Sequence, residues 1–374
     1  MKIAVIGPLT MPTVQGGMSR HCIEIYSRIA ANGHDVTIMC GNAEAENFRG
    51  VRLQRVGMIK KGRWDRLSYG LTASLAAARG DFDVVHYHSF ASSGFCFLPH
   101  LLHPKNHQRV VATIHRLEWQ DEKWGRTVRA LLRTNERITM NNADALIAVS
   151  KNLAASGAQR FPKAAPIHYI ANGISPIAEV GTEVLSDFGI TPNRYVLIVG
   201  RIVPEKGIHL AFDAFDQLRA SNRDQNYQLV VVGAARDGEN EYVKSLRVRA
   251  DASESNIKML GTQTGDTLAA LFRGASIFCS PSFHEGQPLA LLEAMSVGIP
   301  VVASDIVAHR ELMVEAGVLT AVGDVNQLAT ALGELIFDPN EASRIGARGR
   351  AFITESGDFD WDRSAQETER ILIP

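Results

Sequence analysis

The sequence has few of the features that mark secreted, membrane-spanning or nucleic-acid-binding proteins. Its 374 residues include four scattered cysteines and no C-x-x-C pair, so neither a disulfide framework nor a zinc site is indicated. No run of about 18 apolar residues occurs, which argues against a transmembrane helix. The formal net charge is −1, so no global electrostatic field favours nucleic acid. The N-terminal apolar run is too short for a signal peptide, and we expect a cytoplasmic protein.

Short apolar runs rich in β-branched residues alternate with helical segments along the whole chain. Runs that are apolar throughout are typical of parallel strands covered by helices on both faces. The sequence therefore predicts an α/β protein with two doubly wound, Rossmann-like domains. The expected strands are Ile3–Ile6, Val36–Met39, Val84–Tyr87, Val110–Ile114, Ala145–Val149, Val196–Val199, Leu229–Val232, Ile257–Leu260, Ile277–Cys279 and Val301–Ala303.

A turn and a polar segment near the middle of the chain indicate where the first domain ends. This stretch, Ser175–Pro192, begins within the turn sequence ANGISP and carries two further glycines. We expect one domain over residues 1–178 and a second over residues 179–359. A last helix is expected at about 360–374, around Trp361.

The most informative segment is Ser282–Ser304, with the sequence SFHEGQPLALLEAMSVGIPVVAS. Pro288 suits the first turn of a helix, because its missing N–H costs nothing there. Glu285 then lies in the loop before the helix, and Glu293 lies one to two turns inside it. The free N–H groups at a helix start attract a phosphate or a polar sugar, and carboxylates accept hydrogen bonds from hydroxyl groups. The segment therefore predicts a site for a sugar joined to a phosphate.

Two cationic residues follow the expected strand Val196–Val199. The motif is GRIVPEKG, which places Arg201 and Lys206 in a loop that enters a helix near Gly207. An arginine binds two phosphate oxygens at once, whereas a lysine acts as a compact point charge. The pair predicts a diphosphate site, where both charges neutralise a leaving group. A solvated loop with a neighbouring Glu205–Lys206 pair is the alternative.

Two adjacent glycines, Gly16 and Gly17, lie in the loop after the first expected strand. Glycines let the backbone approach a ligand closely, and the helix that follows offers its N-terminus. The spacing is not G-x-G-x-x-G, so a dinucleotide-binding fingerprint is not supported.

Three histidines, His86, His88 and His115, lie at or just beyond the ends of expected strands. His86 and His88 are two residues apart and share one face of the sheet if the strand continues past Tyr87. We expect at least one of them to pack or to form a hydrogen bond. No other ligand residue is close in the sequence, so no metal site is predicted.

Arginines recur at helical spacing downstream of these histidines. At intervals of three, four and four residues they form one basic stripe on a helix. The stripe suits contact with anionic lipid head groups or a phosphate-bearing molecule, but it also suits an ordinary solvated face. Its members are Arg126, Arg129, Arg133 and Arg137.

The segment around Glu285 and Glu293 fits E-G-x-P-L-x-L-L-E-A-M-x-x-G-x-P-V-V-A and resembles the signature of the retaining glycosyltransferases of family 4. The GRIVPEKG motif, the loop with adjacent glycines and the T-x-H element ending at His115 resemble the same family, which has the GT-B fold. The resemblance spans nearly the whole chain. Residues 115–125, HRLEWQDEKWG, resemble a bacterial subgroup in which many members assemble polysaccharides or surface glycans.

The resemblance implies transfer of a hexose-type sugar, with retention, from a nucleotide diphosphate donor to an acceptor hydroxyl in glycan or glycoconjugate biosynthesis. UDP is favoured over GDP, and the acceptor is a sugar, a lipid-linked molecule or another small molecule. Residues 1–178 would bind the acceptor and 179–359 the nucleotide sugar. The last helix would cross back onto the first domain rather than end the second. No cofactor or metal is implied. If the basic stripe is more than a solvated face, it would contact the inner face of the membrane.

The resemblance also implies roles for single residues. Gln287 stands where many relatives carry Phe, which leaves the donor sugar open. The catalytic set is His115, Arg201, Lys206 and Glu285. The donor-binding set is Gly16, Gly17, Arg201, Lys206, Glu285, Gly286, Gln287, Pro288, Leu289 and Glu293.

Two other functions fit the same motifs. One is a different GT-B enzyme, such as a sugar-nucleotide 2-epimerase or a phosphorylase; the epimerase would isomerise its substrate without an acceptor. The other is a protein that binds a nucleotide sugar but has lost the chemistry. The intact charged residues Arg201, Lys206, Glu285 and Glu293 argue against this second alternative.

Overall fold

The chain divides into two compact units in the computed structural model. The model describes residues 1–12, 16–59, 64–102, 108–121, 124–221, 226–235, 240–252, 257–313 and 316–373. One unit comprises Met1–Gly173 and Asp358–Pro374, and the other comprises Ile174–Gly357. The sequence placed these divisions at residues 178 and 359. Two positions of the HRLEWQDEKWG segment, 122 and 123, lie outside the described residues.

The first unit contains an eight-stranded sheet and a separate two-stranded one. Its strands are β1 (Lys2–Ile6), β2 (Thr10–Met11), β3 (Asp35–Cys40), β4 (Asn42–Ala43), β5 (Asn47–Phe48), β6 (Val51–Arg55), β7 (Val84–Tyr87), β8 (Arg109–Ile114), β9 (Ala145–Ala148) and β10 (Ile167–Tyr169). The large sheet has the order β10-β9-β8-β7-β1-β3-β6-β5, and β2 pairs with β4. All pairs are parallel except β5 with β6. The chain adds strands on both sides of β1, as in doubly wound folds.

Helices pack on both faces of the large sheet. They are α1 (Gly17–Ala31), α2 (Trp64–Arg79), α3 (Phe90–Ser93), α4 (Leu98–Leu102), α5 (Arg126–Asn142), α6 (Lys151–Arg160) and α14 (Trp361–Leu372), with a 3₁₀ turn η1 (Glu118–Gln120). Successive side chains of β7 point to opposite faces of the sheet. Tyr87 packs in a hydrophobic core with Tyr69 of α2, whereas His86 contacts Tyr26 of α1.

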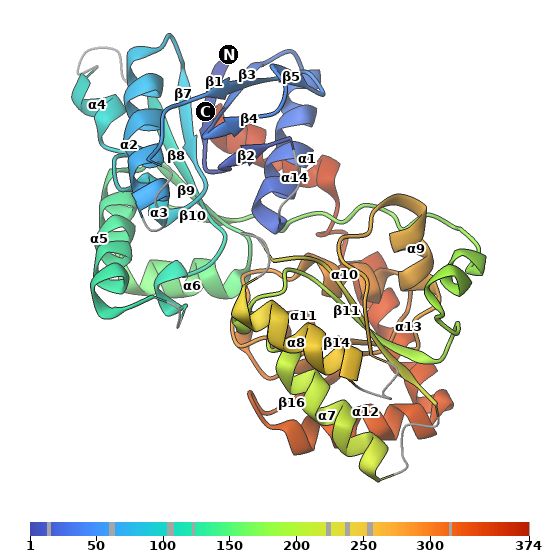
Figure 1. Cartoon of the computed structure of the whole chain (residues 1–374). Helices are drawn as coiled ribbons and strands as arrows, with labels where there is room; N and C mark the ends of the chain where they lie inside the picture. Colours follow the sequence, from blue (N-terminus) through green and yellow to red (C-terminus); the bar gives the residue numbers. More distant parts are fainter. Residues whose placement is uncertain are drawn as a thin grey trace. The chain divides into compact units, whose positions relative to one another are not determined.

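The last helix, α14, packs against α1 within the first unit (Figure 1). The hydroxyl of Ser364 donates a hydrogen bond of 2.7 Å to the carbonyl of Ala171. Trp361 is buried against Gly173, where a Cβ atom would come within 2.3 Å of the Trp361 nitrogen. Helix α14 therefore belongs to the first unit.

The second unit is built on a six-stranded, fully parallel sheet. Its strands are β11 (Tyr195–Val199), β12 (Gln228–Val232), β13 (Ile257–Met259), β14 (Ile277–Ser280), β15 (Val301–Ser304) and β16 (Val318–Thr320). Their order is β13-β12-β11-β14-β15-β16. The prediction of two doubly wound α/β domains is therefore confirmed.

Seven helices and two 3₁₀ turns accompany this sheet in the described part of the second unit. They are η2 (Glu183–Phe188), η3 (Pro204–Lys206), α7 (Ile208–Ala220), α8 (Glu241–Ala252), α9 (Gly265–Arg273), α10 (Leu289–Ser296), α11 (Val307–Leu312), α12 (Val325–Phe337) and α13 (Pro339–Ser356). Phe212 and Phe215 of α7 are fully buried and pack in one core with Leu332 of α12. Across the described residues of the chain, we find no helix whose length and hydrophobicity would let it cross a membrane.

Candidate functional site

The candidate site of the second unit lies where the strand order reverses. β11 lies between β12 and β14, and open α/β sheets bind ligands beyond the carboxyl ends of strands at such a point. The two segments that the sequence singled out follow β11 and β14 directly. The sheet therefore brings together motifs that are about 80 residues apart in the chain.

A glycine controls how the loop after β11 enters α7. Gly207 has φ of 64°, a left-handed conformation that costs little only for glycine. A Cβ atom here would lie 2.1 Å from the carbonyl oxygen of Pro281, just after β14. The close approach places Lys206, the last residue of η3, beside the loop that carries Glu285.

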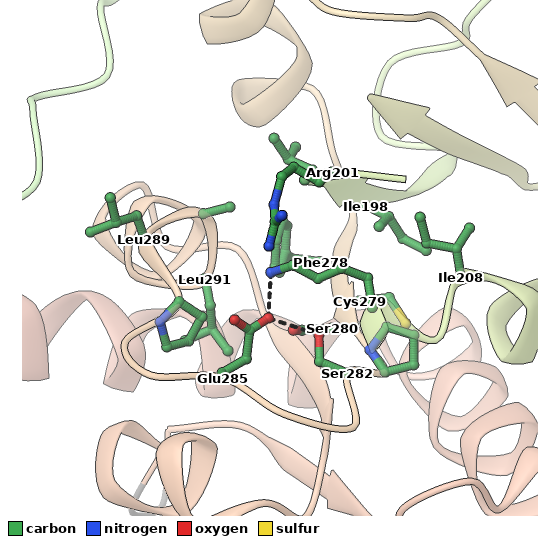
Figure 2. Close-up of a pocket in the computed structure, with 16 residues that line it drawn as sticks. Ile198, Arg201, Ile208, Phe278, Cys279, Ser280, Ser282, Glu285, Leu289 and Leu291 are labelled. Atoms are coloured by element: carbon green, nitrogen blue, oxygen red, sulfur yellow. Dashed lines mark hydrogen bonds and ion pairs between the residues drawn. The ribbon is translucent and has the colours of Figure 1, made fainter. Parts of the chain in front are cut away.

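Lys206 and Glu285 form an ion pair in this site. Figure 2 labels Glu285, with Ser282 beside it. The hydroxyl of Ser282 donates a second hydrogen bond of 2.8 Å to the same carboxylate oxygen. Only 24% of the lysine and 11% of the glutamate side chain is exposed. Burial alone would raise the pKa of Glu285, but the charge of Lys206 and the two hydrogen bonds outweigh it and lower the pKa.

The helix after this loop begins one residue later than its proline suggested. Pro288 is the N-cap, with an extended backbone (φ −78°, ψ 97°), and α10 starts at Leu289. Its place outside the first turn corrects the prediction. Glu293 is the fifth residue of α10, consistent with the expected one to two turns, and is 4% exposed.

Five of the predicted donor-binding residues line one cavity of the second unit (Figure 2). They are Arg201, Lys206, Glu285, Pro288 and Leu289. Gly286, Gln287 and Glu293 belong to the same loop and helix but are not among the lining residues.

Polar residues that the sequence analysis did not single out lie beneath the loop of Glu285. The hydroxyl of Ser304 donates to the carbonyl of Ser282. His309 is fully buried in α11; its Nδ1 lies 2.7 Å from the carbonyl of Ser304, and its Nε2 lies 3.2 Å from the hydroxyl of Ser280. This network holds the ends of β14 and β15. No local motif marks it, because its members come from three elements.

The adjacent glycines of the first unit lie at the start of α1. Gly16 is the N-cap and Gly17 the first helical residue, and no side chain of the described residues caps the N-terminus. Residues 13–15 of the same loop lie outside the described part. The helix start therefore presents backbone N–H groups next to two positions without side chains.

His86 and His88 both contact the hydroxyl of Tyr26. The oxygen lies 2.7 Å from Nδ1 of His86 and 2.5 Å from Nε2 of His88. The other ring nitrogen of His86 lies 2.8 Å from the hydroxyl of Thr113. Although β7 ends at Tyr87, both histidines lie on the face covered by α1, and both are buried. The expectation that at least one of them packs or forms a hydrogen bond is confirmed.

His115 belongs to a buried cluster that includes a histidine missed by the sequence analysis. Its Nε2 lies 3.0 Å from Nδ1 of His88, and its ring centroid lies 4.7 Å from that of His21 in α1. Nδ1 of His21 lies 2.6 Å from Oδ1 of Asn172, a partner 151 residues away that no local pattern could indicate. Burial lowers the pKa of His21 to about 4 and holds those of His88 and His115 well below 6.5.

The arginine stripe lies on α5, but its members differ in environment. Arg126, Arg133 and Arg137 are exposed, whereas Arg129 is partly buried. The guanidinium of Arg133 stacks over the ring of Trp119, 4.6 Å from its centroid. The exposed face therefore carries three arginines, one of which is held by an aromatic ring.

Comparison with known proteins identifies both halves of the chain. Residues 15–176 match the family model Glycosyltransferase Family 4, and residues 186–352 match the model Glycosyl transferases group 1. An MMP α-(1→4)-mannosyltransferase of Mycolicibacterium hassiacum is 30% identical over 316 residues, which is 79% of this chain and 72% of that protein. A glycogen synthase of Mycobacterium tuberculosis is 27% identical over 100% of this chain and 94% of its own length.

Solved structures are similar to the chain over its full length. HepE of Anabaena, solved in complex with UDP-glucose, has a TM-score of 0.79 at 21% identity, over 100% of this chain and 99% of that chain. The family models, the mannosyltransferase relative and the shared fold all agree with the motifs at Glu285 and Lys206. The chain is therefore a glycosyltransferase that belongs to family 4 and has the GT-B fold.

Proposed function

We propose that the enzyme transfers a hexose-type sugar from a nucleotide diphosphate donor to an acceptor hydroxyl and retains the anomeric configuration. The observation that carries the proposal is the cavity at the ends of β11 and β14, where Arg201, Lys206 and Glu285 lie together. Two cations suit a diphosphate, and a buried carboxylate suits sugar hydroxyls. The UDP-glucose in the solved structure of HepE supports UDP as the nucleotide.

The leaving diphosphate is the part of the donor on which negative charge develops, so it is the part that cations stabilise. As the bond between the anomeric carbon and the phosphate oxygen breaks, its electron pair moves to that oxygen, and Arg201 and Lys206 stabilise the resulting charge. Gly16 and Gly17, at the start of α1 in the first unit, also belong to the donor-binding set in this proposal. Glu293 binds the ribose hydroxyls in this scheme.

The sugar is held by the loop before α10 and by a histidine. Glu285 accepts hydrogen bonds from sugar hydroxyls, with the backbone of Gly286, Gln287, Pro288 and Leu289 around it. His115 of the first unit has a catalytic role in this proposal. The acceptor oxygen attacks from the face that the diphosphate leaves, and its proton passes to a phosphate oxygen. This front-face course retains the configuration without a carboxylate nucleophile.

The acceptor belongs to glycan or glycoconjugate biosynthesis in this proposal, and it includes lipid-linked molecules. The exposed arginines at 126, 133 and 137 on α5 form a surface suited to anionic head groups. We therefore propose peripheral contact with the inner face of the membrane through this helix.

The test starts with donor binding. Melting-shift measurements with UDP-, GDP-, ADP- and dTDP-sugars identify the donor, and an acceptor panel with product detection by NMR gives the anomeric configuration. The Arg201→Ala variant should lose about 30- to 1,000-fold in kcat/KM, corresponding to about 2–4 kcal/mol of transition-state stabilisation.

The matched control is Arg344→Ala, because Arg344 lies on α13 of the same unit and pairs with Glu341 on the surface. This variant should keep its activity. Near-normal kcat/KM in the Arg201 variant would refute the assignment of the diphosphate site. An inverted product, or isomerised donor formed without any acceptor, would refute the proposed reaction.

A further inference from the structure

Three histidine side chains of the first unit bring ring nitrogens together inside the protein. One nitrogen each of His21, His88 and His115 lies within 4.8 Å of the others. His21 and His88 are 3% and 1% exposed, whereas His115 is partly exposed. The three come from α1 and from the segments after β7 and β8, so the fold assembles the cluster at the carboxyl ends of parallel strands.

The hydrogen bond that His21 donates to Asn172 decides which nitrogen of His21 is free. Oδ1 of Asn172 can only accept, so Nδ1 of His21 carries the proton of this 2.6 Å bond. With the proton on Nδ1, Nε2 of the neutral imidazole holds the lone pair. Among the described residues, this buried Nε2 has no hydrogen-bond partner. An orphaned acceptor in such a place indicates an atom that the cluster is built to receive.

The partners of the other rings allow two further lone pairs to face the same point. If Nε2–H of His88 donates to the oxygen of Tyr26, Nδ1 of His88 becomes free. The Tyr26 hydroxyl then donates to Nδ1 of His86, whose Nε2–H donates to Thr113. This arrangement keeps the hydrogen bonds of Tyr26 and His86, and a bound ion would replace the 3.0 Å contact between Nδ1 of His88 and Nε2 of His115. Such outer hydrogen bonds orient histidine ligands in metal sites.

We propose that His21, His88 and His115 bind a divalent transition metal ion of the zinc class through three imidazole nitrogens, with a fourth position open. Neutral imidazoles suit Zn²⁺, Cu²⁺ and Ni²⁺ rather than Mg²⁺ or Ca²⁺, which take oxygen ligands. Three protein ligands and an open position are also the usual set of an accessible zinc site. The partly exposed His115 provides the side from which the ion enters.

The ion would inhibit sugar transfer rather than assist it. This step rests on the proposed function, because it assumes that His115 acts near the reacting centre. Zinc holds Nε2 of His115 and so removes this side chain from the donor sugar. The metal-free protein is the active form, and micromolar zinc lowers the transfer rate.

Zinc binding can be measured without donor or acceptor. Untagged protein is stripped with chelator and titrated with ZnCl₂ against a chromophoric competitor, and with CoCl₂ by visible absorption. We expect one ion per chain and the strong visible bands of four-coordinate cobalt. His21→Ala should weaken zinc binding by more than about 100-fold, and Asn172→Ala, which keeps all three ligands, by about 10- to 100-fold.

His168→Ala is the matched control, because this exposed histidine of β10 lies in the same unit outside the cluster. It should bind zinc like the unchanged protein, and circular dichroism checks that all variants are folded. Cobalt spectra of the unchanged protein with only weak, six-coordinate bands would overturn the proposal, as would equal zinc affinity in His21→Ala. Zinc binding without inhibition would overturn the inhibitory role alone. If no donor or acceptor supports transfer, the proposed function fails while the titration still tests the site.

Discussion

Replacing Lys206 with methionine tests the electrostatics of the candidate site through stability alone. The substitution keeps an unbranched side chain but removes the ammonium group that pairs with Glu285. The Glu285 side chain is only 11% exposed in the unchanged protein, and the variant retains the Ser282 hydroxyl that donates to its carboxylate. The variant therefore leaves a buried negative charge without its cation.

The loss of unfolding free energy in Lys206→Met has an upper limit, because Glu285 can take up a proton. Removing one partner of a fully buried ion pair costs about 3–5 kcal/mol. Glu285 escapes part of this cost by taking up a proton; at pH 7, protonating a carboxyl of pKa 4.5 costs about 3.4 kcal/mol, at about 1.36 kcal/mol per pH unit. Lys206 is 24% exposed, so water screens part of the pair. We expect the free energy of unfolding to fall by about 1–3 kcal/mol at pH 7.

The pH dependence distinguishes this mechanism from a loss of packing. In the unchanged protein the pKa of Glu285 is lowered, so its stabilising effect is present above pH 4.5 and is lost as the pH falls through the lowered pKa. In the variant, burial without a cation raises the pKa, so the carboxyl destabilises the fold increasingly as the pH rises above 4.5. The difference in stability between the two proteins should therefore grow from pH 5 to pH 8.

Calorimetric unfolding at several pH values measures this difference. Lys244→Met is the control, because Lys244 forms a lysine–glutamate pair with Glu241 on the surface of the same unit, with side chains 52% and 93% exposed. Exposed pairs of this kind contribute about 0–1 kcal/mol, so the control should change little. A loss in Lys206→Met that is independent of pH, or no larger than that of the control, would refute the reasoning.

Two further predictions concern metal and membrane. Transfer should retain its full rate in EDTA, because Arg201 and Lys206 neutralise the diphosphate in the proposed mechanism; a loss that Mg²⁺ restores would contradict this. Co-sedimentation with vesicles containing anionic lipid should fall by about 10-fold or more when Arg126 and Arg137 are both changed to glutamate, since each basic residue near a surface contributes about 1 kcal/mol. Arg344→Glu is the control, and equal pelleting of both variants would argue against α5 as the contact surface.

Much of the fold could be predicted because its signals are local. Each of the ten expected strands is present, with ends that differ by one residue at most. Buried parallel strands form continuous apolar runs, which stand out in the sequence. The strands that were missed are short, such as β4 and β5, or have exposed polar positions, as in β6 with the sequence VRLQR. Edge strands are stabilised by their neighbours rather than by their own composition.

The sequence predicted which loops carry the residues of the candidate site, but it did not predict the contacts between those loops. The sequence placed Lys206 and Glu285 at the ends of two strands but assigned them to different parts of the donor. Their ion pair depends on β11 and β14 being neighbours in the sheet and on the close approach at Gly207. In the same way, the contact between His21 and Asn172 depends on packing between distant segments. Such contacts depend on which strands and helices are neighbours in the fold, and local sequence patterns do not give that information.

The pairing of Lys206 with Glu285 bears on how the proposed donor is recognised. A diphosphate that binds Lys206 takes this cation from Glu285, so part of the new interaction replaces one that the free protein already has. A nucleotide without its sugar would leave the buried carboxylate with only Ser282, whereas a complete donor also offers sugar hydroxyls to Glu285. Because an unpaired buried charge is costly, the site should favour the complete donor over the bare nucleotide. In melting-shift measurements UDP-sugar should therefore stabilise the protein more than UDP does, and an equal or larger shift with UDP would show that Glu285 gains nothing from the sugar.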